Sequence, residues 1–209
     1  MTGRAPFERF SSPAVVLLRD DVDTDQIIPA RYLKTVSRDG LAEGLFADWR
    51  FDDRGVPKPD FILNDPAMAG RRILVAGANF GSGSSREHAA WALVAWGFRA
   101  VVAAGFADIF RGNALKNGLL PVELGVEGHQ QVVAVLAEDP SAALTVDLEA
   151  QQLGLPDGAQ LAFPLDPFSR TLLLSGADEL GYLLSLDGEI AAWEASHPSP
   201  ISTLARADA

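Results

Sequence analysis

Residues 79–88 read Asn79-Phe80-Gly81-Ser82-Gly83-Ser84-Ser85-Arg86-Glu87-His88, and this stretch decides the fold of the chain. The run before it, residues 72–77, is apolar and is typical of a buried strand. The run after it, residues 89–96, is rich in alanine and tryptophan and predicts a helix packed on a core. The three runs together predict a strand, a Gly/Ser-rich turn and a helix, which is the repeating unit of an α/β domain.

The chemistry of this turn favours a small carboxylate ligand. Gly81 and Gly83 allow a tight turn and let another molecule approach the backbone closely. The first N–H groups of a helix have no partner within the helix and attract negative charge. Arg86 adds a fixed cation that can bind a carboxylate through two parallel hydrogen bonds.

A purely structural interpretation of the same residues also stands. Ser84-x-x-Glu87 matches a capping box, in which Ser84 accepts from the amide of Glu87 and Glu87 reaches back to the cap. A residue at a helix start can be both a cap and part of a site, so both interpretations remain open.

Two further blocks have the same polar, turn-rich character. The first runs from Asp21 through Pro29 and continues as Tyr32-Leu33-Lys34; the second is Gly105-Phe106-Ala107-Asp108-Ile109-Phe110-Arg111-Gly112-Asn113, followed by residues 117–122. In this order the three blocks resemble the swivelling domain of the aconitase superfamily and, within it, the family of 3-isopropylmalate dehydratase small subunits. The resemblance extends from about Phe7 to Trp193, nearly the whole chain.

The resemblance implies a single α/β domain with the aconitase-like swivelling β/β/α fold over residues 1–196. It also implies a mobile substrate-recognition loop at about residues 34–60, while residues 197–209 are expected to form a flexible tail. Hydrophobic patterning predicts strands at 14–18, 72–76, 100–103, 120–124, 144–148 and 160–163, and helices at 85–96, 107–116, 128–137, 167–174, 178–184 and 188–195. Helices that follow strands in mid-chain indicate parallel pairing there, and residues 155–158 carry a turn signal.

The resemblance also assigns roles to residues. Ser84 matches the catalytic base, Ser85 and Arg86 would bind the substrate, and Asp25 and Lys34 would take part in substrate binding. Tyr32, Leu33 and Lys34 would form the loop that selects the substrate side chain.

Several of these residues also fit a purely structural or surface role. Asp25 also fits a simple polar turn before Ile27-Ile28-Pro29. Lys34, and Arg31 beside it, also fit solvated surface charges. Asn79 is expected to brace its loop, and His88 to pack rather than to act as a base.

The chain has no cysteine, and its three histidines, His88, His129 and His197, show no metal-ligand spacing. Iron–sulfur clusters are held mainly by cysteine thiolates, so this chain is expected to bind no metal. The resemblance implies a [4Fe–4S] cluster on a partner, the large subunit. With that partner, the chain would act as a hydro-lyase on a small dicarboxylate, isomerising it by dehydration and rehydration in leucine biosynthesis.

The composition also argues against two classes of partner, nucleic acids and membranes. A net charge of -11 argues against a nucleic-acid backbone, because phosphate contacts need clustered Lys and Arg. No apolar run approaches the roughly 20 residues that span a bilayer, and the first residues lack the apolar stretch of a signal peptide. A cytoplasmic protein without a membrane partner is therefore expected.

The sequence departs from the family pattern in places that leave the substrate open. Ser82 stands where the family motif often has cysteine, and residues 168–176 replace a stretch that usually contains His-Cys. Isopropylmalate is the expected substrate, but another 2-alkylmalate of the methylmalate or homoaconitate type, or a non-catalytic partner-binding module, remains an alternative.

Overall fold

The computed structural model describes residues 4–33 and 40–197. Within this part of the chain, seven strands form one sheet in the order β4-β3-β2-β1-β5-β6-β7. The strands are β1 (Phe10–Leu17), β2 (Ile73–Ala76), β3 (Ala100–Ala103), β4 (Leu120–Glu123), β5 (Ala143–Asp147), β6 (Gln152–Gly154) and β7 (Gln160–Ala162). Strands β1 to β4 pair in parallel, whereas β1, β5, β6 and β7 pair antiparallel, so the sheet is mixed.

The helices fall into short ones early in the chain and longer ones later. They are α1 (Thr24–Ile27), α2 (Leu41–Gly44), α3 (Ala47–Arg50), α4 (Glu87–Trp96), α5 (Asp108–Lys116), α6 (Gly125–Glu138), α7 (Pro167–Ser175), α8 (Glu179–Ser185) and α9 (Asp187–Ser196). Helices α4 and α5 connect parallel strands, as the mid-chain pattern predicts.

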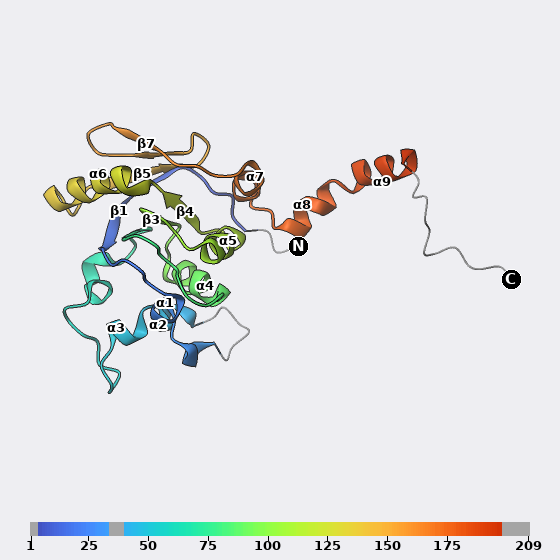
Figure 1. The fold of residues 1–209 in the computed structure, drawn as a ribbon. Coiled ribbons are helices and arrows are strands. Elements are labelled where there is room, and N and C mark those ends of the chain that lie inside the picture. The colour runs from blue at the N-terminus through green and yellow to red at the C-terminus, as the bar shows by residue number, and fades with distance from the viewer. Residues whose placement is uncertain (1–3, 34–39, 198–209) are drawn as a thin grey trace.

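The two central parallel strands, β2 and β3, are apolar along their whole length because both faces of the sheet are covered. All residues of β2 and β3 are buried. Alternate side chains enter two cores: Leu74 and Val101 pack with α4, α5 and the 41–63 segment, while Ile73 and Val102 pack with α6 and strands β5 and β6. Figure 1 shows α4 and α5 on the opposite side of the sheet from α6. The predicted single α/β domain is confirmed.

Most predicted elements are present within a few residues of their expected ends. The turn at residues 155–158 is confirmed, since the amide of Gly158 donates to the carbonyl of Leu155 at 3.0 Å. Strand β6 was not predicted, because three residues with a central Leu153 are too short to show an alternating pattern.

Within the stretch predicted as a mobile loop at 34–60, residues 41–51 largely pack against the first core, and the mobility of the loop stays a prediction. Leu45 and Phe46 are fully buried, and Phe46 stacks on Trp49 with ring centroids 5.4 Å apart. The Arg50 guanidinium donates to the carbonyls of Ala42 at 3.2 Å and Leu45 at 3.3 Å, and burial lowers its pKa. Only residues 52–59 form the exposed polar loop that the prolines indicate. Residues 34–39, Lys34 among them, lie outside the described residues.

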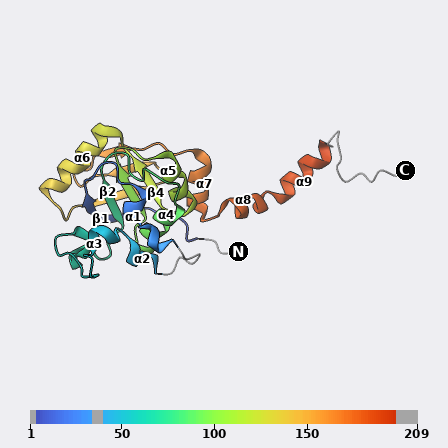
Figure 2. The ribbon, with the colours of Figure 1, turned by 60° about the horizontal axis from the view of Figure 1, so that its bottom comes forward.

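The C-terminal helices leave the body of the domain. Helix α7 packs Leu173 into the second core, but α8 and α9 extend away from the sheet in both views (Figures 1 and 2). The predicted tail beyond His197 lies outside the described residues. In the described part of the chain, no helix combines the length and apolar character needed to cross a membrane.

Candidate active site

The three sequence blocks meet at the carboxyl ends of β1, β2 and β3. The segment after β1 pairs with the Gly/Ser turn after β2, where the Thr24 amide donates to the Ser82 carbonyl at 2.9 Å. The same turn pairs with the segment after β3, where the Phe80 amide donates to the Gly105 carbonyl at 3.1 Å. Ligands of parallel α/β sheets bind at this edge, so the topology places all three blocks where a site is expected.

Glycine at position 81 is required by this close approach. Gly81 has φ of 79°, and a Cβ atom built there would lie 2.1 Å from the ring of Phe110 on α5. The turn therefore lies directly on the block at residues 105–113.

Ser84 lies at the exposed end of this turn. Its carbonyl accepts from the Thr24 hydroxyl at 2.9 Å, which fixes its backbone. Its hydroxyl makes no hydrogen bond to any residue that the structure describes, and Ser85 beside it is also exposed. Ser84 therefore presents a free hydroxyl on a fixed backbone.

The capping box expected at Ser84 and Glu87 is wrong. Helix α4 begins at Glu87 with Arg86 as its N-cap, and the Arg86 side chain makes no capping hydrogen bond. Among the described residues, the amides of Ser85, Arg86 and Glu87 have no acceptor. The helix start is thus open to an anion, as the alternative interpretation requires.

A capping box is formed instead in the block that begins at Asp21. The Asp23 carboxylate accepts from the amides of Asp25 at 2.6 Å and Gln26 at 2.9 Å, and the Gln26 side chain accepts from the Asp23 amide at 3.0 Å. The polar-turn role considered for Asp25 therefore belongs to Asp23.

Asp25 pairs with Arg86 across the two blocks. Nη1 of Arg86 donates to the Asp25 carboxylate, and the two side chains are 20% and 47% exposed. Nε and Nη2 of Arg86 have no partner among the described residues. One edge of the guanidinium is held by Asp25, and the other is available for a second carboxylate.

The other carboxylates around this corner are also engaged. Asn79, with φ of 51°, donates from its side chain to Asp21 at 2.8 Å, which confirms its expected bracing role. Glu87 accepts from the Asn117 side chain at 2.8 Å and so turns toward the end of α5. Each of these carboxylates turns toward its amide partner, so neither pairs with Arg86.

Asn117 and Trp91 were not predicted to support the site. Asn117 is only 3% exposed, and it accepts from the Trp91 indole at 2.8 Å while it donates to Glu87. The signal for it is a polar residue between the end of a helix and an apolar strand, where a buried amide needs partners. His88 packs against Trp91 with ring centroids 4.5 Å apart, as expected.

The segment predicted to select the substrate is partly packed. Tyr32 and Leu33 lie against the first core, and a Cβ atom on Gly44 would lie 2.8 Å from the Tyr32 ring. Lys34 lies outside the described residues. Arg31 pairs with Asp48 at 2.6 Å on the surface, and this hydrogen bond raises the pKa of Arg31. The surface alternative considered for Arg31 is therefore favoured.

A hollow of about 720 Å³ lies beside this segment and is lined by Arg31, Tyr32, Asp48 and Arg50 among others. Neither Ser84 nor Arg86 lines it. Ser84 and Ser85 are exposed, so the carboxylate corner is an open surface that a second molecule would have to close over.

Metal-binding groups do not gather at this corner. Within residues 4–33 and 40–197, no three His, Asp or Glu side chains are placed to hold an ion. The chain also has no cysteine.

Comparison with known proteins places this geometry in a family context. A sequence profile of the aconitase C-terminal domain matches residues 6–127, and a second profile, LeuD_N, matches residues 130–167. The chain is 55% identical over 201 residues to a 3-isopropylmalate dehydratase small subunit from Roseiflexus sp. (strain RS-1), which covers 96% of this chain and 98% of that protein. A small subunit of the same name from Anaeromyxobacter sp. (strain K) is 54% identical over 189 residues, or 90% of this chain and 97% of that protein.

A solved structure agrees with these matches. The crystal structure of 3-isopropylmalate dehydratase (leuD) from Methanocaldococcus jannaschii superposes with a TM-score of 0.63 at 28% identity, covering 89% of this chain and 99% of that chain. The family and the fold predicted from the three sequence blocks are confirmed.

Proposed function

This chain belongs to the family of 3-isopropylmalate dehydratase small subunits, and we propose that it is the small subunit of such an enzyme. It acts with a large subunit as a hydro-lyase that converts 2-isopropylmalate to 3-isopropylmalate in leucine biosynthesis. The observation that supports this most directly is the convergence of Ser84, Arg86 and Asp25 at one open helix start.

Ser84 is the proposed base that removes a proton from the carbon beside a substrate carboxylate. A serine hydroxyl is a poor base at neutral pH and needs surroundings that stabilise its alkoxide. The uncapped start of α4 and the Arg86 guanidinium supply positive potential beside Ser84. Because the hydroxyl has no partner among the described residues, it is free to exchange a proton with substrate.

Arg86 and its neighbours bind the substrate in this proposal. The edge of the guanidinium that Asp25 leaves free clamps a substrate carboxylate. Asp25 is a positioning residue that fixes the direction of this edge, and Ser85 donates a further hydrogen bond. The Tyr32–Lys34 segment, which leads into residues 34–39, selects the substrate side chain.

The departing hydroxyl requires a group that this chain does not provide. With no cysteine, the chain has no ligand set for an iron–sulfur cluster, so we assign the cluster to the large subunit. There it would supply the Lewis acid for the hydroxyl. An open Ser84 corner fits a site that is completed when the subunits meet. Since the substrates are soluble metabolites, the proposed compartment is the cytoplasm.

The test is anaerobic turnover of the chain mixed with its cluster-loaded large subunit, with 2-isopropylmalate and 2-methylmalate offered separately. We expect kcat/KM for isopropylmalate to be about 10-fold higher or more, because each extra apolar group in a fitted pocket contributes about 1–3 kcal/mol. Higher kcat/KM for methylmalate would reassign the substrate and keep the chemistry. Tight association without turnover of either acid would favour the non-catalytic binding module.

Arg86 provides a sharper test of the carboxylate clamp. Arg86→Gln is expected to lower kcat/KM by about 10- to 100-fold, mainly through KM, because a charged hydrogen bond contributes about 1.5–3 kcal/mol. Arg86→Lys keeps the charge but loses the paired donors, so it should recover only part of this loss. Steady-state kinetics of the assembled enzyme measure both.

Arg9→Gln is the matched control, because Arg9 forms a surface ion pair with Asp147 at 3.5 Å and its side chain is 69% exposed. It should leave kcat and KM unchanged. An Arg86→Gln enzyme with wild-type KM would remove Arg86 from substrate binding.

A further inference from the structure

The two C-terminal helices expose an unusual set of apolar side chains. We define the arm as residues 178–197, which include α8 and α9. Its exposed apolar side chains are Leu180 (64%), Leu183 (54%), Leu184 (56%), Ile190 (41%) and Trp193 (61%). Single exposed apolar residues are normal on a monomer, but five large ones gathered on two consecutive helices indicate an interaction surface.

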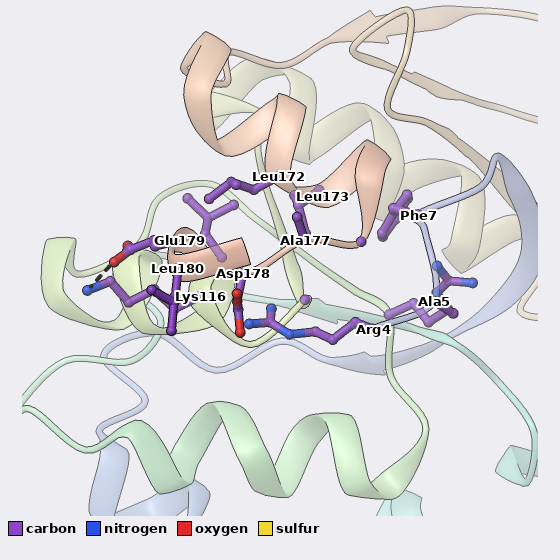
Figure 3. Close-up of a pocket in the computed structure, with 14 residues that line it drawn as sticks. Arg4, Ala5, Phe7, Lys116, Leu172, Leu173, Ala177, Asp178, Glu179 and Leu180 are labelled. Atoms are coloured by element: carbon purple, nitrogen blue, oxygen red, sulfur yellow. Dashed lines mark ion pairs between the residues drawn. The ribbon is translucent and has the colours of Figure 1, made fainter. Parts of the chain in front are cut away.

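The arm touches the rest of the domain only at its base. Glu179 pairs with Lys116 at 3.6 Å (Figure 3), and Tyr182 contacts Phe168 of α7 with ring centroids 5.3 Å apart. Beyond Leu183, the side-chain hydrogen bonds and ring contacts of the arm stay within the arm itself, among the residues that the structure describes. Figures 1 and 2 show it extending away from the sheet.

A chain of contacts links the base of the arm to the start of α4. Lys116 precedes Asn117, whose side chain donates to Glu87 at 2.8 Å, and Glu87 follows Ser84 by three residues. A molecule that closes over Ser84 and extends along this chain of contacts would reach the arm. A cavity of about 230 Å³ lies at the base of the arm and is lined by apolar and charged side chains, Leu172, Leu180 and Lys116 among them (Figure 3).

The charge of the arm argues against a second copy of this chain as its partner. Residues 178–197 contain five acidic residues, Asp178, Glu179, Asp187, Glu189 and Glu194, and no Lys or Arg. The whole chain carries a net charge of -11, so two arms packed together would bring like charges into contact. The complementary surface is apolar and edged with Lys or Arg.

We propose that the arm docks on the large subunit of the enzyme, on an apolar strip bordered by basic side chains. This inference rests on the proposed function, which supplies the partner. The arm anchors the partner beside Ser84, and Trp193 is its main contact with Leu183 supporting it, since tryptophan is enriched among the side chains that dominate interface energies.

The test compares Leu183→Glu/Trp193→Glu with the wild-type chain in titrations against the cluster-loaded large subunit. We expect Kd to rise about 30-fold or more, which corresponds to the loss of about 2 kcal/mol expected at an interface hot spot. Turnover should recover at a saturating concentration of large subunit. The control is Val126→Glu, because Val126 is 64% exposed on α6. Figure 1 shows α6 on the opposite side of the domain from α9, so the Kd of this variant should be unchanged. Circular dichroism verifies that the exposed substitutions leave the fold intact.

Two outcomes would overturn the proposal. In one outcome, the double variant binds the large subunit with the same Kd as the wild-type chain, and the wild-type enzyme turns over normally. This result would reject the arm as the docking site and keep the proposed function. The other is a dimeric isolated chain that the double variant converts to a monomer, which identifies a second copy as the occupant. Failure of the wild-type chain to bind the large subunit at all would instead reject the proposed function.

Discussion

Replacing Ser84 with alanine is expected to lower the turnover of the assembled enzyme about 1,000-fold or more, without weakening association with the large subunit. The Ser84 hydroxyl is exposed and makes no hydrogen bond among the described residues, so its loss removes no structural contact. The backbone of Ser84 stays in place, because its carbonyl still accepts from Thr24. The variant should therefore separate proton transfer from folding and binding.

Ser82→Ala is the matched control, since it removes the same atom two residues earlier. The Ser82 hydroxyl donates to the Asp21 carbonyl at 3.2 Å, which is a structural contact. We expect Ser82→Ala to shift thermal unfolding slightly and to retain most of the turnover. The measurement is the initial rate of both variants under anaerobic conditions with saturating large subunit. A Ser84→Ala enzyme as active as Ser82→Ala would remove Ser84 from the role of base.

The sequence predicts the elements whose burial produces a repeating pattern. Strand β3 matches its prediction at both ends, since Ala100–Ala103 is apolar and buried on both faces. Short helices and strands cannot be predicted from such a pattern. Helices α1 and α2 have four residues each, too few to show helical periodicity. The Asp23 capping box stabilises the start of α1, and a hydrogen bond from Arg50 to the Ala42 carbonyl holds α2.

For the candidate site, too, the sequence predicts the local chemistry but not the long-range contacts. The residue types around Ser84 predict an anion corner from local chemistry alone. Its assembly depends on contacts between distant segments, such as the bond from Thr24 to Ser84 and the pair of Arg86 with Asp25. The spacing Ser84-x-x-Glu87 fits a capping box, and so does Asp23-x-x-Gln26. The structure forms the box at Asp23, whereas at Ser84 the extended backbone of Arg86 delays the helix to Glu87.

Gly81→Ala is expected to destabilise the domain by about 3 kcal/mol or more, a large share of the stability of a typical domain. A left-handed backbone costs a residue with a Cβ about 1–2 kcal/mol. The new methyl would also lie 2.1 Å from the Phe110 ring, and overpacking a dense core costs about 1–3 kcal/mol. Phe110 is 1% exposed and packs on Phe80 with centroids 5.3 Å apart, so it has little room to move.

Alanine substitutions at two other glycines separate the backbone cost from the steric cost, and denaturant unfolding measures both. Gly83 has φ of 84°, but its nearest neighbour for a Cβ is the Asp23 Cβ at 3.3 Å, so Gly83→Ala should lose mainly the backbone term. Gly112 lies in α5 with nothing within 4 Å, and Gly112→Ala should be neutral or stabilising by up to about 1 kcal/mol.

A double variant identifies the clash itself. Gly81→Ala combined with Phe110→Leu should be more stable than the sum of the two single losses, because the smaller side chain makes room for the methyl. Strict additivity, or a Gly81→Ala loss no larger than that of Gly83→Ala, would contradict the packing of the turn on α5. Gly81 joins the Ser84 turn to the block at residues 105–113. The same substitution should therefore abolish turnover under any condition in which the variant is unfolded. Loss of activity in a fully folded Gly81→Ala chain would instead locate the effect in the geometry of the turn.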